Sequence, residues 1–157
     1  MNVSDLVLKE DAINLLCGKL LGEGETRKVF QCNLMPNHVI KVESNVNSFH
    51  NIREFEIWSE VMNIPHMARW FARVHSMSHN GRFLIMEKTA PARDDEYPDR
   101  IPVFFDDIKR ENFGLITIRN KKTNVKTNCL VAHDYANNNL YKLGLTKRMR
   151  KVDWDAE

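Results

Sequence analysis

The sequence predicts an α+β fold, in which an antiparallel sheet with one long helix forms a first lobe and a smaller second lobe follows. Three observations predict it. Short apolar segments separated by turn residues fill positions 19–43, as expected for antiparallel strands. An apolar residue then recurs every three positions from Ile52 to Val61, which is typical of an amphipathic helix. Finally, Asn80-Gly81 is a favoured turn between two paired strands.

Composition narrows the class of protein. The chain has 157 residues, of which 43% are hydrophobic and 28% charged, so we expect one globular domain or two small lobes. The net charge of +2 is too small to favour a nucleic-acid partner. Acidic residues near the N-terminus and the lack of a long apolar run argue against a signal peptide or a membrane span. A cytoplasmic protein is expected.

Cysteine and histidine give no sign of a metal site or a disulfide framework. Cys17, Cys32 and Cys129 lie far apart in apolar stretches, without a C-x-x-C pair, so they are expected to be free core thiols. His75 and His79 flank the Asn-Gly turn, where a spacing of four does not bring two rings to one ion.

Periodicity and turn residues give the elements of the first lobe. Ser4 is expected to cap a short N-terminal helix. The segments "KVFQCNL" and "HVIKVE" are predicted to pair across a turn at residues 35–37, and a helix is predicted over 49–62, ending before Pro65. A second hairpin is expected from "MARWFARVHSM" and "RFLIMEKT" around the Asn-Gly turn.

The second lobe begins after a stretch rich in proline and acid, "APARDDEYPDRIP". We therefore predict a first lobe over 1–89, a hinge or linker over 90–102 and a reduced second lobe over 103–157. Within the last of these, a long hairpin tipped by "NKKTN" is expected between Asn112 and Asp134, and the charged tail "KRMRKVDWDAE" is expected to be loosely ordered.

The stretch "LLGEGETRKVF" (residues 20–30) carries the first chemical signal. Gly22 and Gly24 would let backbone N–H groups approach phosphate oxygens, and Lys41, on the next strand but one, would add a positive charge. Glu54 shares the inward face of the following helix with its apolar residues, so it is the expected partner of Lys41, whereas Glu56 points elsewhere. The Walker pattern of a P-loop is absent.

These motifs resemble those of protein kinases. In order along the chain, "LGEGETRKVF" is similar to the Gly-rich loop, "HVIKVE" to the strand that carries the lysine, "NIREFEIW" to the αC helix, "FLIMEKTA" to the strand that enters the hinge, "DDIKRENFGLI" to the catalytic loop and "HDYA" to D-F-G. The likeness covers residues 20–136. It is closer still to the small kinase-like proteins of bacteriophages.

The resemblance implies that the chain binds ATP and Mg²⁺. Lys41 would contact the α- and β-phosphates and pair with Glu54. Met86 would lie behind the adenine as the gatekeeper, and the backbone of Glu87 and Thr89 would bind its edge. The residues implied in nucleotide binding are thus Gly22, Gly24, Lys41, Glu54, Met86, Glu87 and Thr89.

The resemblance also implies the catalytic and metal-binding residues. Asp107 would orient or deprotonate an acceptor hydroxyl, and Lys109 would steady the γ-phosphate; with Lys41 they are the implied catalytic residues. Asn112 and Asp134 would hold Mg²⁺. Phosphoryl transfer needs a metal, a lysine and a positioned carboxylate more than covalent chemistry, and all of these residue types are present.

Several positions depart from the kinase pattern. Arg27 replaces the third glycine of the loop, where it could contact or shield phosphate. Phe105-Asp106 stands in place of the His-Arg pair, and Ala136 replaces the glycine of D-F-G. Few residues separate Thr89 from Asp107, and few follow Ala136, so the second lobe is expected to be vestigial.

Three functions stay open at this point. The first is a minimal Mg-ATP-dependent kinase acting on a protein hydroxyl, in the setting of phage takeover of a host and therefore in the host cytoplasm. The second is a weak or inactive pseudokinase scaffold that binds a host or partner protein. The third is transfer of a nucleotide instead of a phosphate. A homodimer or a host protein is an alternative way to complete the second lobe.

Overall fold

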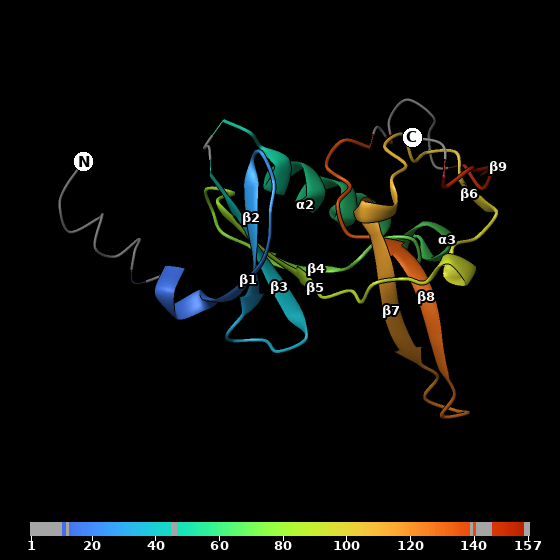
Figure 1. Ribbon diagram of the computed structural model, residues 1–157, viewed down its shortest axis with the longest axis horizontal. Helices are drawn as coiled ribbons and strands as arrows, with labels where there is room; N and C mark the ends of the chain where they lie inside the picture. Colours follow the sequence, from blue (N-terminus) through green and yellow to red (C-terminus); the bar gives the residue numbers. More distant parts are fainter. Residues whose placement is uncertain (1–10, 12, 45–46, 139, 141–145, 156–157) are drawn as a thin grey trace. The chain divides into compact units, whose positions relative to one another are not determined.

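The computed structural model describes the chain except residues 1–10, 12, 45–46, 139, 141–145 and 156–157 (Figure 1). The chain forms two compact units. The first runs to Ile52 and includes Val74–Lys88, and the second comprises Arg53–Arg73 with Thr89 onward. Helix α2 (His50–Val61) therefore contributes residues to both units.

The first unit is built on a five-stranded antiparallel sheet in the order β1-β2-β3-β5-β4 (Figure 1). Its strands are β1 (Cys17–Glu23), β2 (Arg27–Cys32), β3 (His38–Glu43), β4 (Val74–Met77) and β5 (Phe83–Glu87). The glycine stretch forms the β1–β2 turn, closed by a 2.8 Å hydrogen bond from Gly24 N to Arg27 O. It joins two strands and opens no helix. The predicted α+β, kinase-like arrangement of glycine turn, lysine strand and following helix is thereby confirmed.

The β4–β5 hairpin turns at the expected Asn-Gly pair. Gly81 has φ +71°, a left-handed conformation that favours glycine, and a Cβ there would lie 2.5 Å from Cγ1 of Ile52. The hairpin is shorter than predicted, since β4 begins at Val74. The residues before it include helix α3 (Pro65–Ala68), because proline suits the first turn of a helix.

Helix α2 begins and ends within one residue of its predicted bounds, but its buried face is rotated from the apolar series. Phe55 is 37% exposed, whereas the buried positions include Asn51, Glu54, Ile57 and Val61. Two polar side chains thus lie on the inward face. Their hydrogen bonds, given below, explain why they can be buried there at tolerable cost.

The second unit contains two small antiparallel sheets. One pairs β7 (Phe113–Arg119) with β8 (Lys126–Ala132), and the other pairs β6 (Arg100–Pro102) with β9 (Met149–Lys151). Short 3-10 turns lie at Asp94–Glu96 and Arg110–Asn112. The core is aromatic, with neighbouring ring centroids 4.9 to 5.7 Å apart among Phe71, Phe104, Phe105, Phe113 and Tyr135. Phe105, at the histidine position of the kinase motif, is fully buried in this cluster.

The prediction of a loosely ordered C-terminal tail was wrong for residues 149–154. Met149–Lys151 pairs with β6, and Trp154 Nε1 donates a 2.8 Å hydrogen bond to the carbonyl of Pro98. At the other end, the helix expected from Ser4 lies largely outside the described residues. In the part of it that the structure describes, residues 13–16 are helical. None of the described helices has the length and apolarity needed to cross a membrane.

Candidate active site

Gly22 and Gly24 have no internal reason to lack a side chain. Gly81 alone among the described glycines has a positive φ. A Cβ at Gly22 would meet no atom within 4 Å, and one at Gly24 would meet only Arg27 O at 3.8 Å. Neither backbone conformation nor packing in the described chain therefore requires glycine here. A bare backbone at these two positions leaves room for close approach by another molecule.

The side chain of Arg27 is buried within the first unit, which does not suit a phosphate contact. It is 7% exposed, and its Nη1 donates a 3.3 Å hydrogen bond to Oδ1 of Asn51. The backbone N–H of Asn51 donates to Glu43 Oε1 at 2.6 Å, and its Nδ2 donates to the carbonyl of Lys41 at 3.2 Å. This buried network fixes the backbone of Lys41 in its strand. Asn51 gave no signal in the sequence, because a helical asparagine is usually solvated.

The other expected nucleotide-binding residues of the first unit lie on the inner strands of the sheet. Lys41 is 4% exposed at the middle of β3, and Met86 is fully buried on β5. Glu87 follows Met86 and lies opposite His38. Lys41 belongs to the first unit and Glu54 to the second, so their ion pair stays a prediction.

Asn112 links the expected catalytic residues of the second unit. Its carbonyl accepts hydrogen bonds from the backbone N–H groups of His133, at 2.8 Å, and Asp134, at 3.3 Å. Its side-chain Nδ2 donates to the carbonyl of Asp107 at 3.1 Å. Lys109 Nζ lies 3.6 Å from Asp107 Oδ1. Asp107, Lys109, Asn112 and Asp134 are thus brought together by one short 3-10 turn.

Asn112 and Asp134 offer the oxygen donors that Mg²⁺ prefers. Asn112 is 7% exposed; its Nδ2 donates to the carbonyl of Asp107, and its Oδ1 is the acceptor atom of the amide. Asp134 is exposed. Across the described positions no group of three or more His, Cys, Asp or Glu gathers as a metal cage. The pair therefore fits a magnesium ion that takes its remaining ligands from phosphate and water, and does not fit a closed structural metal site.

Glu54 is fully buried and is a hydrogen-bond acceptor for the segment that follows Asp134. The backbone N–H of Tyr135 donates to Glu54 Oε1 at 3.1 Å, and the Tyr135 hydroxyl donates to the carbonyl of Ala72 at 3.1 Å. Two well-separated bonds thereby fix both ends of Tyr135. This places a constraint on the residue directly after the expected metal ligand.

His133 connects Thr89 to the 3-10 turn at Arg110–Asn112. Its Nε2 lies 2.9 Å from the carbonyl of Glu111, which can only accept, so Nε2 carries the proton. In the neutral ring Nδ1 then accepts from the Thr89 hydroxyl, 2.7 Å away. Gly114 completes this contact, since a Cβ there would lie 2.6 Å from Thr89 Oγ1. No sequence pattern indicates this role for His133, because its partners lie up to 44 positions away.

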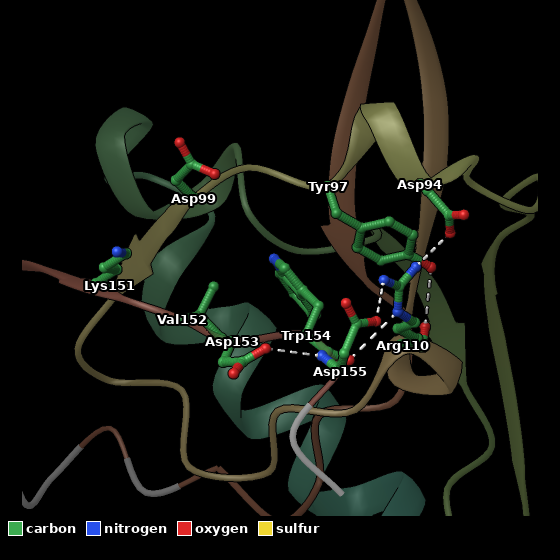
Figure 2. A pocket seen from close by; sticks show the side chains of 9 residues that line it. All are labelled: Asp94, Tyr97, Asp99, Arg110, Lys151, Val152, Asp153, Trp154 and Asp155. Carbon is green, nitrogen blue, oxygen red and sulfur yellow. Dashed lines mark hydrogen bonds and ion pairs between the residues drawn. The ribbon is translucent and has the colours of Figure 1, made fainter.

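Arg110, in the 3-10 turn Arg110–Asn112, is held by side chains from two distant segments (Figure 2). Its guanidinium bonds Asp94 and Asp155, both at 2.6 Å, and stacks 4.7 Å from the centre of the Tyr97 ring. The Trp154 ring packs 4.8 Å from that of Tyr97. The hydrogen bond to Asp155 raises the pKa of Arg110. These residues line an open pocket of about 1010 Å³, in which Arg110 pairs with Asp94 and Asp155.

His38, beside Glu87, is the histidine with a perturbed pKa in the first unit. Desolvation, and next the neighbouring His75, lower its pKa, while Glu87 opposes them. The two imidazole rings meet edge to face at 5.6 Å. Nδ1 of His38 is buried without a hydrogen-bond partner. Protonation of His38 is therefore disfavoured in the folded protein.

Comparison with known proteins yields structural likenesses only. No protein-family model and no curated protein matches the chain. Among solved structures, the gentamicin complex of APH(2")-IIa has 22% identity and a TM-score of 0.42 over 59% of this chain and 30% of its own. The streptomycin-ATP ternary complex of APH(2")-IIa has 25% identity and a TM-score of 0.40, over 57% of this chain and 30% of its own. A kinase domain, PF14_0431, has 15% identity and a TM-score of 0.43, over 88% of this chain and 49% of its own.

The chain spans less than half the length of each of these three proteins. What carries the fold assignment is the chain's own topology, with its glycine turn between β1 and β2, Lys41 on β3, and α2 between β3 and β4. The protein has an α+β, protein-kinase-like fold.

Proposed function

We propose that the protein is a minimal ATP- and Mg²⁺-dependent phosphotransferase. The observation that carries the proposal is the role of Asn112, which ties the Asp107 segment to Asp134 through three hydrogen bonds of 2.8 to 3.3 Å. A carboxylate, a lysine and two oxygen donors in one place are the groups that phosphoryl transfer requires.

The proposed step needs no covalent enzyme intermediate. Asp107 orients the acceptor hydroxyl and accepts its proton as the hydroxyl oxygen bonds the γ-phosphorus. The bond from that phosphorus to the bridging oxygen breaks, and ADP leaves with the electron pair. Lys109 stabilises charge on the transferred group. When bound by Asn112 and Asp134, Mg²⁺ would neutralise part of the phosphate charge.

The first unit supports the same proposal as a nucleotide platform. The bare backbone at Gly22 and Gly24 suits approach to phosphates, and Lys41 would supply a charge to the α- and β-phosphates. Met86 and Glu87 of this unit, with Thr89 at the start of the second unit's C-terminal part, would bind the adenine. For the acceptor we propose a protein hydroxyl in a phage-infected host, following the resemblance to bacteriophage kinase-like proteins.

The test is label transfer from γ-labelled ATP in the presence of Mg²⁺, with host lysate as the source of acceptors and gentamicin as a small-molecule comparison. Asp107→Asn should lower turnover by roughly 100-fold or more, because a general base acts mainly at the transition state. ATP affinity should stay within about twofold. Asp95→Asn is the matched control, since its carboxylate is exposed and pairs only with exposed Arg93 among the described contacts.

The rival proposal is that the protein is a kinase-derived scaffold. The segment at Tyr135 and Ala136 supports it. Tyr135 is fixed by two hydrogen bonds, and Ala136 is 6% exposed where a kinase has glycine, so this segment has little freedom to move during a catalytic cycle. A scaffold would show no label transfer in the wild type and undiminished partner binding in Asp107→Asn. Labelled nucleotide remaining on the acceptor from α-labelled ATP would instead indicate nucleotide transfer.

A further inference from the structure

The outer half of the β7–β8 hairpin is not needed to hold Asn112 and Asp134. Residues 113–116 and 130–132 are buried, but every residue from 117 to 128 is exposed. Strand pairing nevertheless continues for three more pairs beyond the buried part, as far as Arg119 opposite Lys126. We call residues 117–128 the basic ribbon; Figure 1 shows the hairpin as a long two-stranded extension.

The basic ribbon concentrates positive charge. It carries Arg119, Lys121, Lys122 and Lys126, and no acidic residue lies anywhere from 113 to 132. Because the whole chain has a net charge of +2, all other residues together carry −2. Asn128, at the base of the ribbon, lies near Glu96, whose charge is already paired with Arg93. The small net charge of the protein thus hides a strongly basic extension.

The paired structure of the basic ribbon brings like charges together, which destabilises it. Like charges directly opposite each other on paired strands are destabilising, yet Arg119 faces Lys126. An exposed two-stranded hairpin is itself marginal in water. It is held here by the backbone ladder, by Thr117 Oγ1 bonding Asn128 Oδ1 at 3.0 Å, and by a turn in which Asn120 Oδ1 accepts from two backbone N–H groups. A partner of opposite charge would remove this repulsion.

We propose that the basic ribbon binds double-stranded DNA through its phosphate backbone and major groove. The major groove of B-DNA admits a two-stranded β-ribbon, and phosphates are contacted by Lys and Arg together with Thr and Asn. The ribbon supplies all four residue types on a narrow, acid-free extension. This binding does not depend on phosphotransfer by the rest of the protein.

Two features favour duplex DNA over other polyanions. The ribbon contains no aromatic residue, so it lacks the stacking platforms by which single strands are usually held. The deep, narrow major groove of A-form RNA does not admit such a ribbon. An acidic protein surface is the remaining rival, and the experiment includes it.

The experiment measures fluorescence anisotropy of a short labelled DNA duplex titrated with the full chain at several salt concentrations. Sequence-independent binding with a dissociation constant on the order of 10⁻⁴ to 10⁻⁶ M is expected. Four phosphate contacts predict a log–log salt slope of roughly −3 to −4. Lys121→Gln with Lys122→Gln should reduce the magnitude of that slope by about 2 and weaken binding at least ~tenfold.

The matched control is Lys19→Gln with Lys88→Gln, two exposed lysines of the first unit, which removes the same charge. The proposal requires that this pair leave the salt slope unchanged, and that duplex DNA compete better than single-stranded DNA, duplex RNA or polyglutamate. An absence of binding at low salt overturns it. So does an equal effect of the control pair, or displacement of the duplex by polyglutamate at equal charge.

Discussion

The buried carboxylate of Glu54 accepts the backbone N–H of Tyr135 at 3.1 Å across 81 positions of sequence. Glu54 is fully buried and Tyr135 is 1% exposed. The residue after Asp134 is therefore held by the one polar side chain that the middle of helix α2 presents inward. The stability of the second unit and the placement of the expected metal ligand depend on the same bond.

Removing the Glu54 acceptor should destabilise the protein. Glu54→Ala leaves the Tyr135 N–H buried without this partner, at a cost of about 1–3 kcal/mol in the free energy of unfolding. Glu54→Gln keeps an acceptor oxygen and should cost less. Glu56→Ala is the control from the same helix, because its 3.8 Å ion pair with Arg53 is largely exposed and worth at most about 0.5 kcal/mol. Urea unfolding measures all three, and equal losses for Glu54 and Glu56 would contradict the assignment.

The contacts of Arg110 with Asp94, Asp155 and Tyr97 should protect the 3-10 turn Arg110–Asn112 from local opening. Arg110→Ala removes both carboxylate bonds and the stacking on Tyr97, whereas Arg110→Lys keeps the charge but not the planar fork. Hydrogen exchange of the amides of 110–113 should therefore quicken most in the alanine variant and less in the lysine variant. Arg93→Ala is the control, since its guanidinium is mostly exposed. Unchanged exchange in Arg110→Ala would show that the turn is held by its backbone alone.

His38 should make stability fall in mild acid. Its folded-state pKa is lowered, mainly by desolvation and then by His75, so the unfolded chain, with an ordinary pKa of about 6.5, binds the proton more readily. The contribution of His38 to the free energy of unfolding is complete above a pH of about 6.5, and it is lost as the pH falls below this value. His38→Gln should flatten this part of the stability profile in urea unfolding at pH 5.5 and 7.5. His79→Gln, on the exposed turn, should not.

The sequence predicted the elements whose pattern is local. Alternation and turn residues located β2, β3 and the Asn-Gly turn, and the helical period located α2 to within one residue at each end. The three-residue strands β6 and β9 were missed, because they are too short for a period and pair across nearly 50 positions. Polar contacts between distant positions, such as Arg110 with Asp155, leave no periodic trace either.

The residues of the candidate site also fall into those that a local pattern predicts and those that depend on distant contacts. Asp107, Lys109 and Asn112 lie within six residues of one another, so their spacing could be read directly. The residues that support the site could not be read in this way: Asn51, which holds Lys41, and His133 act through hydrogen bonds to residues 8 to 44 positions away. Arg27 replaces the third glycine of the loop, a place from which it could contact or shield phosphate. Its burial against Asn51 depends on how α2 is rotated, which the apolar series did not give.

Lys41 should separate nucleotide binding from folding. A buried lysine carries a desolvation cost, so Lys41→Met, which has a similar shape, should shift the melting temperature by only a few degrees. Stabilisation by Mg-ATP, about 2.7 kcal/mol at a ligand concentration 100 times the dissociation constant, should disappear, and Asp134→Asn should weaken it. Lys28→Met is the control, an exposed lysine on the neighbouring strand. A normal thermal shift in Lys41→Met would place the nucleotide elsewhere.

Arg119 should be a residue at which stability and DNA binding oppose each other. Arg119→Glu places a carboxylate opposite Lys126, and a cross-strand pair of opposite charge contributes roughly 0.2–1 kcal/mol. Hydrogen exchange of the ribbon amides should slow accordingly, and the gain should shrink at high salt. Adding Lys126→Glu restores two like charges and should cancel the gain. The same single variant should weaken DNA binding. Faster exchange in Arg119→Glu would mean that the two side chains do not face each other as their register indicates.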